Sequence, residues 1–396
     1  MTDPRTPGRE HWRELVPEDP GSVLTAVRRL ADPAGEPLLA LARSRHAVAE
    51  IALHRASDGA PVGAVPLPAN GSLTGLGVAD RDTPEQAGRL WIGHTDLVTP
   101  PAVHRFDLAT GATVLETAAP GTVDVPGVRT EQRAFTSADG TTVRMFVIAP
   151  PGNAGTGPRP ALVTGYGGFG ISREPAYSAA ALAWAAAGGT YALVSLRGGG
   201  EEGEDWHLAG NRANKQNVFD DLHAAAEALV AAGDTTPGQL AVMGGSNGGL
   251  LVGAALTQRP ELYRAVVCSA PLLDMARYEE FSLGRTWNDE YGTAADPEQL
   301  GWLLSYSPYH HVRDGVPYPA VLFTVFDSDT RVDPLHARKM CAALQHATAG
   351  DPATRPVLLR RETDVGHGAR SVSRTVALTT DQLAFLAAHT GLELTT

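Results

Sequence analysis

The middle of the chain reads QLAVMGGSNGGLLVGAALTQ (239–258). Its beginning is an apolar run of strand length, and the small and apolar residues after Gly248 suit a helix. Between the two lies the pattern Gly-x-Ser-x-Gly, centred on Ser246. Between a strand and a helix this pattern predicts a nucleophile elbow, because the glycines permit the strained turn that exposes a serine hydroxyl. The alternative interpretation is a structural turn without chemistry.

The segments around this motif alternate between strand-like and helix-like composition. Apolar runs of strand length recur from Arg159 onward, and QNVFDDLHAAAEALVAAG (216–233) places its apolar side chains on one helical face. This alternation predicts a mostly parallel sheet with helices on both faces and, with the serine elbow, an α/β-hydrolase fold. Strands are expected at 160–166, 190–197, 239–244, 264–270, 319–326 and 356–363, and helices near 178–188, 216–233, 249–258, 334–347 and 373–389.

Residues 23–150 have a different sequence pattern, with short β-rich runs, turn residues between them and no long helix. The segments IALHRASDG (51–59) and VHRFDLATG (103–111) resemble each other, and their final glycines stand 52 residues apart. This spacing is near the period of about 40–50 residues of one β-propeller blade, although two ordinary hairpins would look the same. We therefore predict an N-terminal segment (1–22), a partial propeller of about two blades (23–127) and a catalytic domain (128–396).

A serine hydroxyl becomes an effective nucleophile when a base accepts its proton and an acid orients that base. In α/β-hydrolases the acid follows the next-to-last strand and the histidine follows the last strand. Here the run PAVLFTVF (319–326) is followed by Asp327, Asp329 and Asp333, and the final strand-like run is followed by His367. His367 lies between two glycines in a loop, which is a poor place for a packed core histidine, so we expect it to be the general base. Loop position alone leaves the choice among the three aspartates open.

The charge balance excludes some classes of partner. With 32 basic and 44 acidic residues the chain has a formal net charge of −12, which repels nucleic acid and anionic membrane surfaces. Lys215 and Lys339 are its only lysines, so nearly every cation is an arginine, a residue suited to bidentate hydrogen bonding.

Other sequence features predict neither a metal nor a membrane segment. Cys268 and Cys341 lack the spacing of a zinc site or a disulfide framework, so we expect both to be reduced. The N-terminus has no apolar leader, and the most apolar stretch (178–196) is interrupted by Gly188 and Gly189. We therefore expect a cytoplasmic protein without a membrane partner.

Two glycine-rich segments, 165–170 and 198–203, formally match the Gly-x-Gly-x-x-Gly pattern of dinucleotide-binding proteins. The second leads into acidic residues, which would repel a pyrophosphate from the start of a helix. The first is followed by Arg173, Glu174 and Pro175 rather than by an immediate helix. We therefore expect no nucleotide cofactor.

Beyond the elbow, the chain from residue 128 to its end carries a series of distinctive stretches. They are GYGGFGIS (165–172), LRGGGEEGEDWH (196–207), NKQNVFDDL (214–222), GGSNGGLL (244–251), QRPELY (258–263), GRTWNDEYG (284–292), YSPYHHV (306–312), DSDTRVDPLH (327–336) and GHGA (366–369). In this order they resemble the prolyl oligopeptidases, a family of serine peptidases that combine an α/β-hydrolase domain with a β-propeller.

The resemblance implies roles for five residues around the elbow. Ser246 would be the nucleophile, His367 the general base and Asp329 the orienting acid. The hydroxyl of Tyr166 and the backbone N–H of Asn247 would form the oxyanion hole. Loss of one such donor typically costs about 3–4 kcal/mol of transition-state stabilisation.

The resemblance also implies a pocket for a proline side chain. Trp287 would stack on the pyrrolidine ring, for which a flat aromatic surface is well suited, and Arg331 would bind a substrate carbonyl. For Arg331 the alternative is an ion pair with Asp327 or Asp333. The intact GGSNGG stretch and Trp287 favour the proline-specific branch over the oligopeptidase B group, which recognises arginine with acidic residues. The remaining pocket residues would be Phe169, Tyr291, Leu272 and Val332.

The chain departs from the family in its N-terminal part. Family members carry a complete propeller, whereas the residues before 128 suffice for about two blades. Uncovered sheet surfaces would favour a homo-oligomer that covers the incomplete propeller, and size selection of substrates would be in doubt. We expect a cofactor-independent enzyme that cleaves short peptides after proline through an acyl-enzyme. The alternatives are a broad serine esterase or amidase and an inactive remnant.

Overall fold

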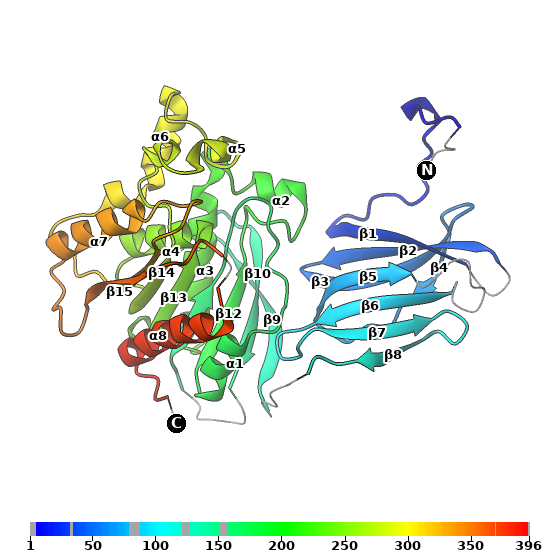
Figure 1. The fold of residues 1–396 in the computed structure, drawn as a ribbon, viewed down its shortest axis with the longest axis horizontal. Coiled ribbons are helices and arrows are strands. Elements are labelled where there is room, and N and C mark those ends of the chain that lie inside the picture. The colour runs from blue at the N-terminus through cyan, green and yellow to red at the C-terminus, as the bar shows by residue number, and fades with distance from the viewer. Residues whose placement is uncertain are drawn as a thin grey trace. The chain divides into compact units, whose positions relative to one another are not determined.

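The computed structural model of the protein describes residues 5–31, 35–78, 88–120, 127–150, 157–368 and 370–394. The chain divides into two compact units, which can be followed by colour in Figure 1. Unit 1 comprises Met1–Asp124, Glu174–Ser178 and Glu201–Gly203, and unit 2 comprises Val125–Arg173, Ala179–Gly200 and Glu204–Thr396. All the candidate site residues named above lie in unit 2.

Unit 1 contains two four-stranded antiparallel sheets, with the strand orders β1-β2-β3-β4 and β5-β6-β7-β8. In both sheets the turn between the third and fourth strands contains a left-handed glycine, Gly59 (φ 77°) or Gly111 (φ 68°). The repeated segments therefore occupy equivalent positions in two small sheets, which confirms the prediction of a partial propeller. The strands are β1 (Ser22–Ala31), β2 (Pro37–Arg45), β3 (Val48–Arg55), β4 (Pro61–Ala64), β5 (Ser72–Val78), β6 (Arg89–Thr95), β7 (Ala102–Asp107) and β8 (Ala112–Thr117).

Unit 1 has an apolar core of its own, to which both sheets contribute. Leu38 and Ile51 of the first sheet belong to the same buried cluster as Ile92 and Phe106 of the second. In β6 the buried residues Leu90 and Ile92 alternate with more exposed neighbours, as the period of two along a strand requires. The two sheets are thus held together by side chains that alternate toward a shared interior.

Unit 2 is built on an eight-stranded sheet with the order β16-β15-β14-β13-β11-β12-β10-β9. Strands β11 to β16 pair in parallel, and β10 pairs antiparallel with both β12 and β9. This mixed, mostly parallel sheet confirms the expected α/β-hydrolase fold. The strands are β9 (Arg129–Thr136), β10 (Thr142–Ala149), β11 (Ala161–Thr164), β12 (Thr190–Ser195), β13 (Leu240–Gly245), β14 (Ala265–Ser269), β15 (Ala320–Phe326) and β16 (Val357–Glu362).

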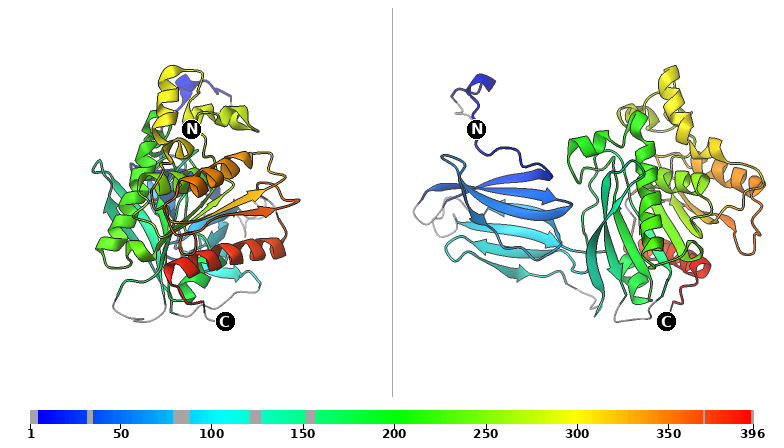
Figure 2. Two further views of the ribbon diagram at one scale, coloured as in Figure 1. Left: turned by 90° about the vertical axis from the view of Figure 1, so that its left-hand side faces the viewer. Right: turned by 180° about the vertical axis from the view of Figure 1, so that it is seen from behind.

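Helices cover both faces of this sheet (Figures 1 and 2). On one face, α3 (Gln216–Ala231), α4 (Asn247–Gln258) and α7 (Leu335–Ala347) share the main apolar core, and on the other α1 (Ala179–Ala186) and α8 (Val372–Thr390) share a second. The remaining helices of unit 2 are α2 (Glu204–Leu208), α5 (Asn288–Tyr291) and α6 (Pro297–Tyr306). The 3₁₀ turns are at Arg9–His11 in unit 1 and at Arg212–Asn214, Pro237–Gln239, Tyr278–Glu280, Gly284–Trp287 and Pro308–His311 in unit 2.

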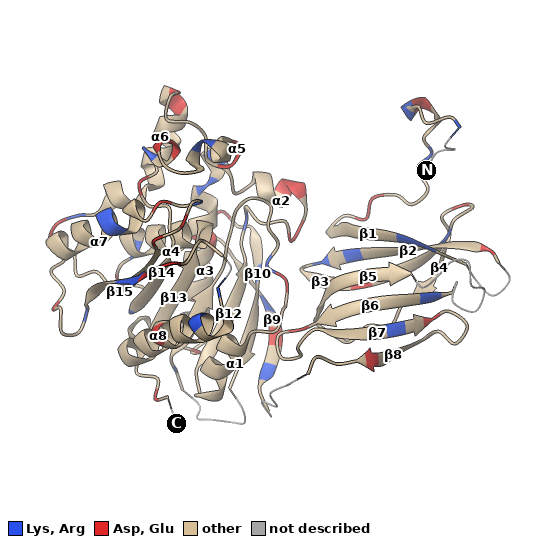
Figure 3. Cartoon of the chain, viewed as in Figure 1, with Lys and Arg blue, Asp and Glu red and all other residues tan. Residues whose placement is uncertain are grey.

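The middle strands of the sheet are apolar. Strands β13 and β14 carry no charged side chain, and Figure 3 shows acidic and basic residues gathered on loops and helices around them. A parallel sheet buried on both faces requires such continuous apolar strands. Among the described residues, no helix combines the length and the apolar character needed to span a bilayer.

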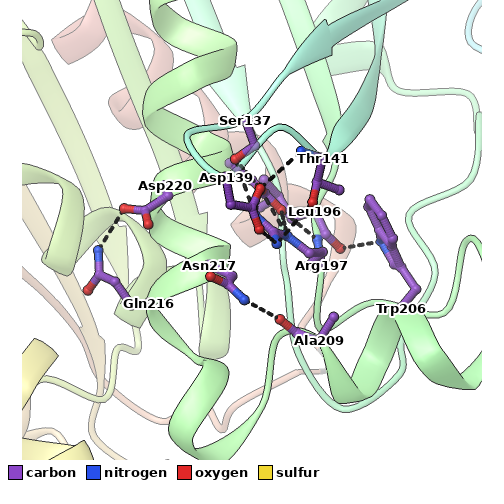
Figure 4. Close-up of polar contacts among 11 residues, drawn as sticks. Ser137, Asp139, Thr141, Leu196, Arg197, Trp206, Ala209, Gln216, Asn217 and Asp220 are labelled. Carbon is purple, nitrogen blue, oxygen red and sulfur yellow. Dashed lines mark hydrogen bonds and ion pairs between the residues drawn. The ribbon is translucent and has the colours of Figure 1, made fainter.

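A buried ion pair fastens the segment after β12 to the rest of unit 2 (Figure 4). The guanidinium of Arg197 donates to Asp221 on α3 (2.7 Å) and to Asp139 in the β9–β10 turn (2.5 Å). Nearby, the indole N–H of Trp206 donates to the carbonyl of Leu196 (2.9 Å). These contacts fix a long loop at the carboxyl edge of the sheet, where the candidate site lies.

Candidate active site

Ser246 occupies the sharp turn between β13 and α4. Its backbone adopts φ 58° and ψ −121°, a combination that residues with a side chain rarely adopt. Its N–H donates to the carbonyl of Ser269 (2.9 Å), and its carbonyl accepts from the N–H of Gly249 (2.8 Å). The turn is so tight that a Cβ atom on Gly244 would lie 2.0 Å from the carbonyl oxygen of Gly248. The glycines of the motif are therefore a steric requirement of the elbow.

The loops after β15 and β16 bring Asp329 and His367 together. The Nδ1 atom of His367 lies 2.7 Å from Oδ2 of Asp329, and Oδ1 accepts the backbone N–H groups of Arg331 and Val332, both at 2.9 Å. The Asp329 side chain is only 1% exposed, and that of His367 is 14% exposed. Because a carboxylate can only accept, Nδ1 carries the proton and Nε2 is the basic nitrogen of the ring.

The other two aspartates of this loop have different partners. Asp327 binds the guanidinium of Arg361 (2.8 Å), which holds the pKa of its carboxyl below the usual value, and also pairs with Arg338 (3.4 Å). Asp333 accepts the backbone N–H of Leu335 (2.9 Å) at the start of α7. Of the three aspartates that the sequence left open, Asp329 is therefore the one placed against the histidine.

Two hydrogen-bond donors converge on the elbow. Tyr166 follows β11, and its hydroxyl lies near the side chain of Ser246. Burial raises the pKa of Tyr166, so the hydroxyl stays protonated at neutral pH. Asn247 is the first residue of α4, where a backbone N–H has no acceptor within the helix. Both groups can donate to an oxygen that develops negative charge beside the serine.

The side chain of Asn247 also links two parts of the site. Its Nδ2 donates to the carbonyl of Tyr166 (2.5 Å), and its Oδ1 accepts the hydroxyl of Tyr291 (2.7 Å). The sequence assigned a role to the backbone of Asn247 alone. This amide, which is 1% exposed, therefore connects the loop after β11 to helix α5.

The expected pocket residues differ in their exposure. Phe169 and Trp287 are partly buried and pack against the main core. Tyr291, Leu272 and Val332 are buried, and Tyr291 contacts the edge of Phe169 with ring centroids 5.6 Å apart. The guanidinium-bearing Arg331 is exposed. The expected pocket residues thus include two partly buried aromatic side chains, three buried residues and one exposed arginine.

The structure adds a charged cluster that the sequence did not single out. Lys215 and Glu290 form an ion pair of 2.8 Å, and their side chains are 1% and 3% exposed. Glu290 immediately precedes Tyr291, and its carboxylate also contacts His207 (2.8 Å). The available signal was that Glu290 lies within the RTWNDEYG stretch and that Lys215 is one of two lysines. Among the described residues, no group of three or more His, Cys, Asp or Glu side chains is arranged to hold a metal ion.

Comparison with known proteins agrees with this geometry. The model of the prolyl oligopeptidase family matches residues 175–393, and the model of the prolyl oligopeptidase N-terminal β-propeller domain matches residues 1–118. The chain belongs to the prolyl oligopeptidase family. The resemblance seen in the sequence motifs is thereby confirmed.

Relatives with assigned names are peptidases of this family. The chain is 37% identical over 338 residues to a prolyl endopeptidase of Elizabethkingia meningoseptica, a match that covers 85% of this chain and 47% of the relative. It is 34% identical over 393 residues to a prolyl oligopeptidase of Omphalotus olearius, covering 96% of this chain and 51% of the relative. The chain therefore spans about half the length of these relatives.

Solved structures of the family have the same fold. One structure, from a study of two prolyl endopeptidases, superimposes with a TM-score of 0.90 at 42% identity, over 99% of this chain and 56% of that chain. Prolyl oligopeptidase B from Galerina marginata, bound to a 35mer hydrolysis and macrocyclization substrate, superimposes with a TM-score of 0.85 at 30% identity. That match covers 97% of this chain and 53% of the other.

Proposed function

We propose that this chain is a serine peptidase that hydrolyses the bond on the carboxyl side of proline in short peptides. The observation that carries the proposal is the Asp329–His367 pair in the loops after β15 and β16, together with a serine elbow after β13 of the same α/β-hydrolase sheet. Ser246, His367 and Asp329 form the proposed triad. No metal or organic cofactor takes part in the proposed chemistry.

In the proposed reaction Ser246 Oγ attacks the scissile carbonyl carbon while Nε2 of His367 takes the hydroxyl proton. Asp329 stabilises the imidazolium through Nδ1, and the hydroxyl of Tyr166 and the N–H of Asn247 bind the oxyanion. The C–N bond then breaks as the imidazolium returns the proton to the leaving amine, which leaves an acyl-enzyme. Water attacks this ester by the same proton path and regenerates the serine.

Specificity for proline is proposed to come from Trp287 and Phe169, which are the two partly buried aromatic residues among the expected pocket residues. A pyrrolidine ring is rigid and weakly polar, so it gains from burial against a flat aromatic surface. We propose that the guanidinium of Arg331, which is exposed, binds a carbonyl of the substrate backbone. This assignment is supported by the names of the relatives, which are prolyl endopeptidases and prolyl oligopeptidases.

The organisation expected from the sequence is part of the same proposal. We propose an N-terminal segment (1–22), a partial propeller (23–127) and a catalytic domain (128–396), acting in the cytoplasm. We also propose that a second copy of the chain covers the incomplete propeller. Sedimentation velocity over a range of concentrations tests this last point, because a homo-oligomer dissociates on dilution and a monomer does not change.

The test of the serine assignment is covalent labelling by a fluorophosphonate. We expect the folded wild-type chain to be labelled at Ser246 and the Ser246→Ala variant to remain unlabelled, since only an activated hydroxyl attacks this reagent readily. Ser269→Ala, which removes a hydroxyl on the neighbouring strand β14, is a matched control and should be labelled like the wild type. A folded wild-type chain that resists labelling would show an inactive remnant.

The test of the substrate class compares a Gly-Pro aryl amide with a simple aryl ester. A prolyl peptidase turns over the amide efficiently, whereas a broad esterase or amidase acts on the ester and shows little preference for proline. Digestion of a peptide mixture, followed by mass spectrometry, adds the cleavage positions. Cuts that do not follow proline would contradict the proposed specificity while leaving the serine assignment intact.

A further inference from the structure

We propose that Glu290 is a positioning residue for the oxyanion hole: its carboxylate, paired with Lys215, holds the loop that carries Tyr166. This inference rests on the proposed function, because it assigns a support to the proposed site. Glu290 hydrogen-bonds with neither Ser246 nor His367. It would act through the conformation of residues 165–170.

The carboxylate of Glu290 binds the loop directly and through the lysine. Its Oε2 accepts the backbone N–H of Phe169 (2.9 Å) and the Nε2 of His207 (2.8 Å), and its Oε1 accepts from Nζ of Lys215 (2.8 Å). Nζ of Lys215 donates in turn to the carbonyl of Gly167 (2.9 Å). One carboxylate and one ammonium thus hold the main chain at both sides of Gly168.

The conformation of this loop needs such support. Phe169 has φ 58°, a left-handed conformation that is unfavourable for a residue with a side chain, and it lies between Gly167 (φ 64°) and Gly170 (φ 61°). The N–H of Phe169 is the group that Glu290 binds. A strained residue persists only where its surroundings fix it, and a charged acceptor provides a stronger hydrogen bond than a neutral one.

The same cluster connects to Asn247 on α4. Glu290 is the residue before Tyr291, and the hydroxyl of Tyr291 binds the side chain of Asn247, which binds the carbonyl of Tyr166. Nζ of Lys215 also lies 5.2 Å from the centre of the Tyr291 ring. The loop after β11 is therefore held to α5 at two points, at Phe169 by Glu290 and at Tyr166 through Asn247.

Stability alone does not explain why two charges are buried here. Replacement of a buried ion pair by apolar side chains of similar size is often neutral or stabilising, because desolvation offsets the attraction. An apolar pair would leave the N–H of Phe169 and the carbonyl of Gly167 without partners in a buried loop. The charges are thus suited to fixing the backbone beside the nucleophile.

The test is a double-mutant cycle between Glu290→Gln and Tyr166→Phe in the full chain, measured as the second-order rate of fluorophosphonate labelling of Ser246. We expect Glu290→Gln alone to slow labelling about tenfold or more, because a displaced donor no longer meets the developing charge. In the Tyr166→Phe background we expect Glu290→Gln to cost less than about twofold, since the group it positions is already gone. A purely structural effect would multiply the two losses.

The matched control is Asp289→Asn, one residue away, which removes a fully exposed carboxylate that pairs with Arg212. It should leave the labelling rate unchanged. If Glu290→Gln does not fold, the double variant Lys215→Met/Glu290→Leu removes both charges without leaving one unpaired, and the same cycle with Tyr166→Phe applies.

The outcomes separate the two proposals. An undiminished rate for Glu290→Gln, or an equal loss in both backgrounds, would overturn the positioning role and leave the serine assignment standing. A wild-type chain that is not labelled would overturn the proposed function, and the positioning role with it.

Discussion

The residues of the site are fixed by hydrogen bonds that leave few alternatives. Both carboxylate oxygens of Asp329 are occupied, one by His367 and the other by two backbone N–H groups, so the carboxylate cannot turn away. Ser246 is held in a strained turn by backbone hydrogen bonds with Ser269 and Gly249. At this scale the chemistry depends on where loops place single atoms.

A prediction at the residue scale concerns Trp287. We expect Trp287→Ala to lower kcat/KM for a Gly-Pro amide by about 10- to 100-fold, equivalent to about 1.4–2.8 kcal/mol, through loss of the aromatic surface for proline. Hydrolysis of a simple aryl ester should change far less, because it makes no use of this surface. Trp12, an exposed tryptophan in the N-terminal segment, provides the control variant Trp12→Ala. Equal losses on amide and ester would argue against a stacking role.

Among the elements, α7 contributes a buried histidine outside the proposed triad. His336 is 2% exposed, and its Nδ1 accepts the backbone N–H groups of Leu273 (3.4 Å) and Asp274 (3.2 Å). Burial lowers the pKa of His336 to about 4 from 6.5. Between pH 4 and pH 6.5, His336 is protonated in the unfolded chain and neutral in the folded chain. The free energy of unfolding therefore decreases as the pH falls from 6.5 to 4.

The matching prediction uses His336→Asn, whose amide oxygen can accept in place of Nδ1 but does not titrate. We expect the free energy of unfolding of the wild type to drop by more than that of the variant over this pH interval, with a difference on the order of 3 kcal/mol. Urea denaturation at several pH values measures it. His11, which is largely exposed, gives the control His11→Asn. Parallel curves for wild type and His336→Asn would refute the buried, neutral state.

The sequence predicted elements well where burial dictates composition. The parallel strands of unit 2 are apolar runs, and each expected strand and helix after Arg159 is present within a few residues. Helix α6 was missed although Asp296 and Pro297 form a standard start, with the Asp296 side chain accepting the N–H groups of Glu298 and Gln299. Strands β1, β4, β5 and β8 were missed because largely exposed or glycine-rich strands lack a clear apolar pattern.

Only those parts of the site that belong to local sequence motifs could be predicted. The strand–glycine–serine pattern and the order of acid and histidine indicate positions along the chain, but loop order could not separate Asp329 from its neighbours. The pair of Lys215 and Glu290 joins residues 75 positions apart. No local pattern predicts such a long-range contact, because the partners meet only after the sheet has formed.

At the scale of the whole molecule, the two units have separate apolar cores. The unit 1 cluster includes Phe106, which is 1% exposed, and among the described residues it shares no member with the clusters of unit 2. Multidomain chains with separate cores often unfold in more than one step. A substitution that reduces packing in one core should therefore lower the stability of the unit that contains this core.

We expect Phe106→Ala to destabilise unit 1 by about 3–5 kcal/mol, the usual cost of deleting a buried aromatic ring. Calorimetry should show one transition moved to lower temperature, while fluorophosphonate labelling of Ser246 at 25 °C is retained. Val114→Ala, on the exposed side of β8, should change stability by less than about 0.5 kcal/mol. Loss of labelling together with the unit 1 transition would mean that the two units fold as one.

The scarcity of lysine has a practical consequence for following the site over time. Reagents that acylate primary amines meet two lysine side chains, and while that of Lys339 is 22% exposed, that of Lys215 is 1% exposed. Lys215 can be acylated only when its contacts with Glu290 and Gly167 come apart. The mass gained at Lys215, relative to that gained at Lys339, would thus record how often the loop at Gly167 separates from Lys215 and Glu290.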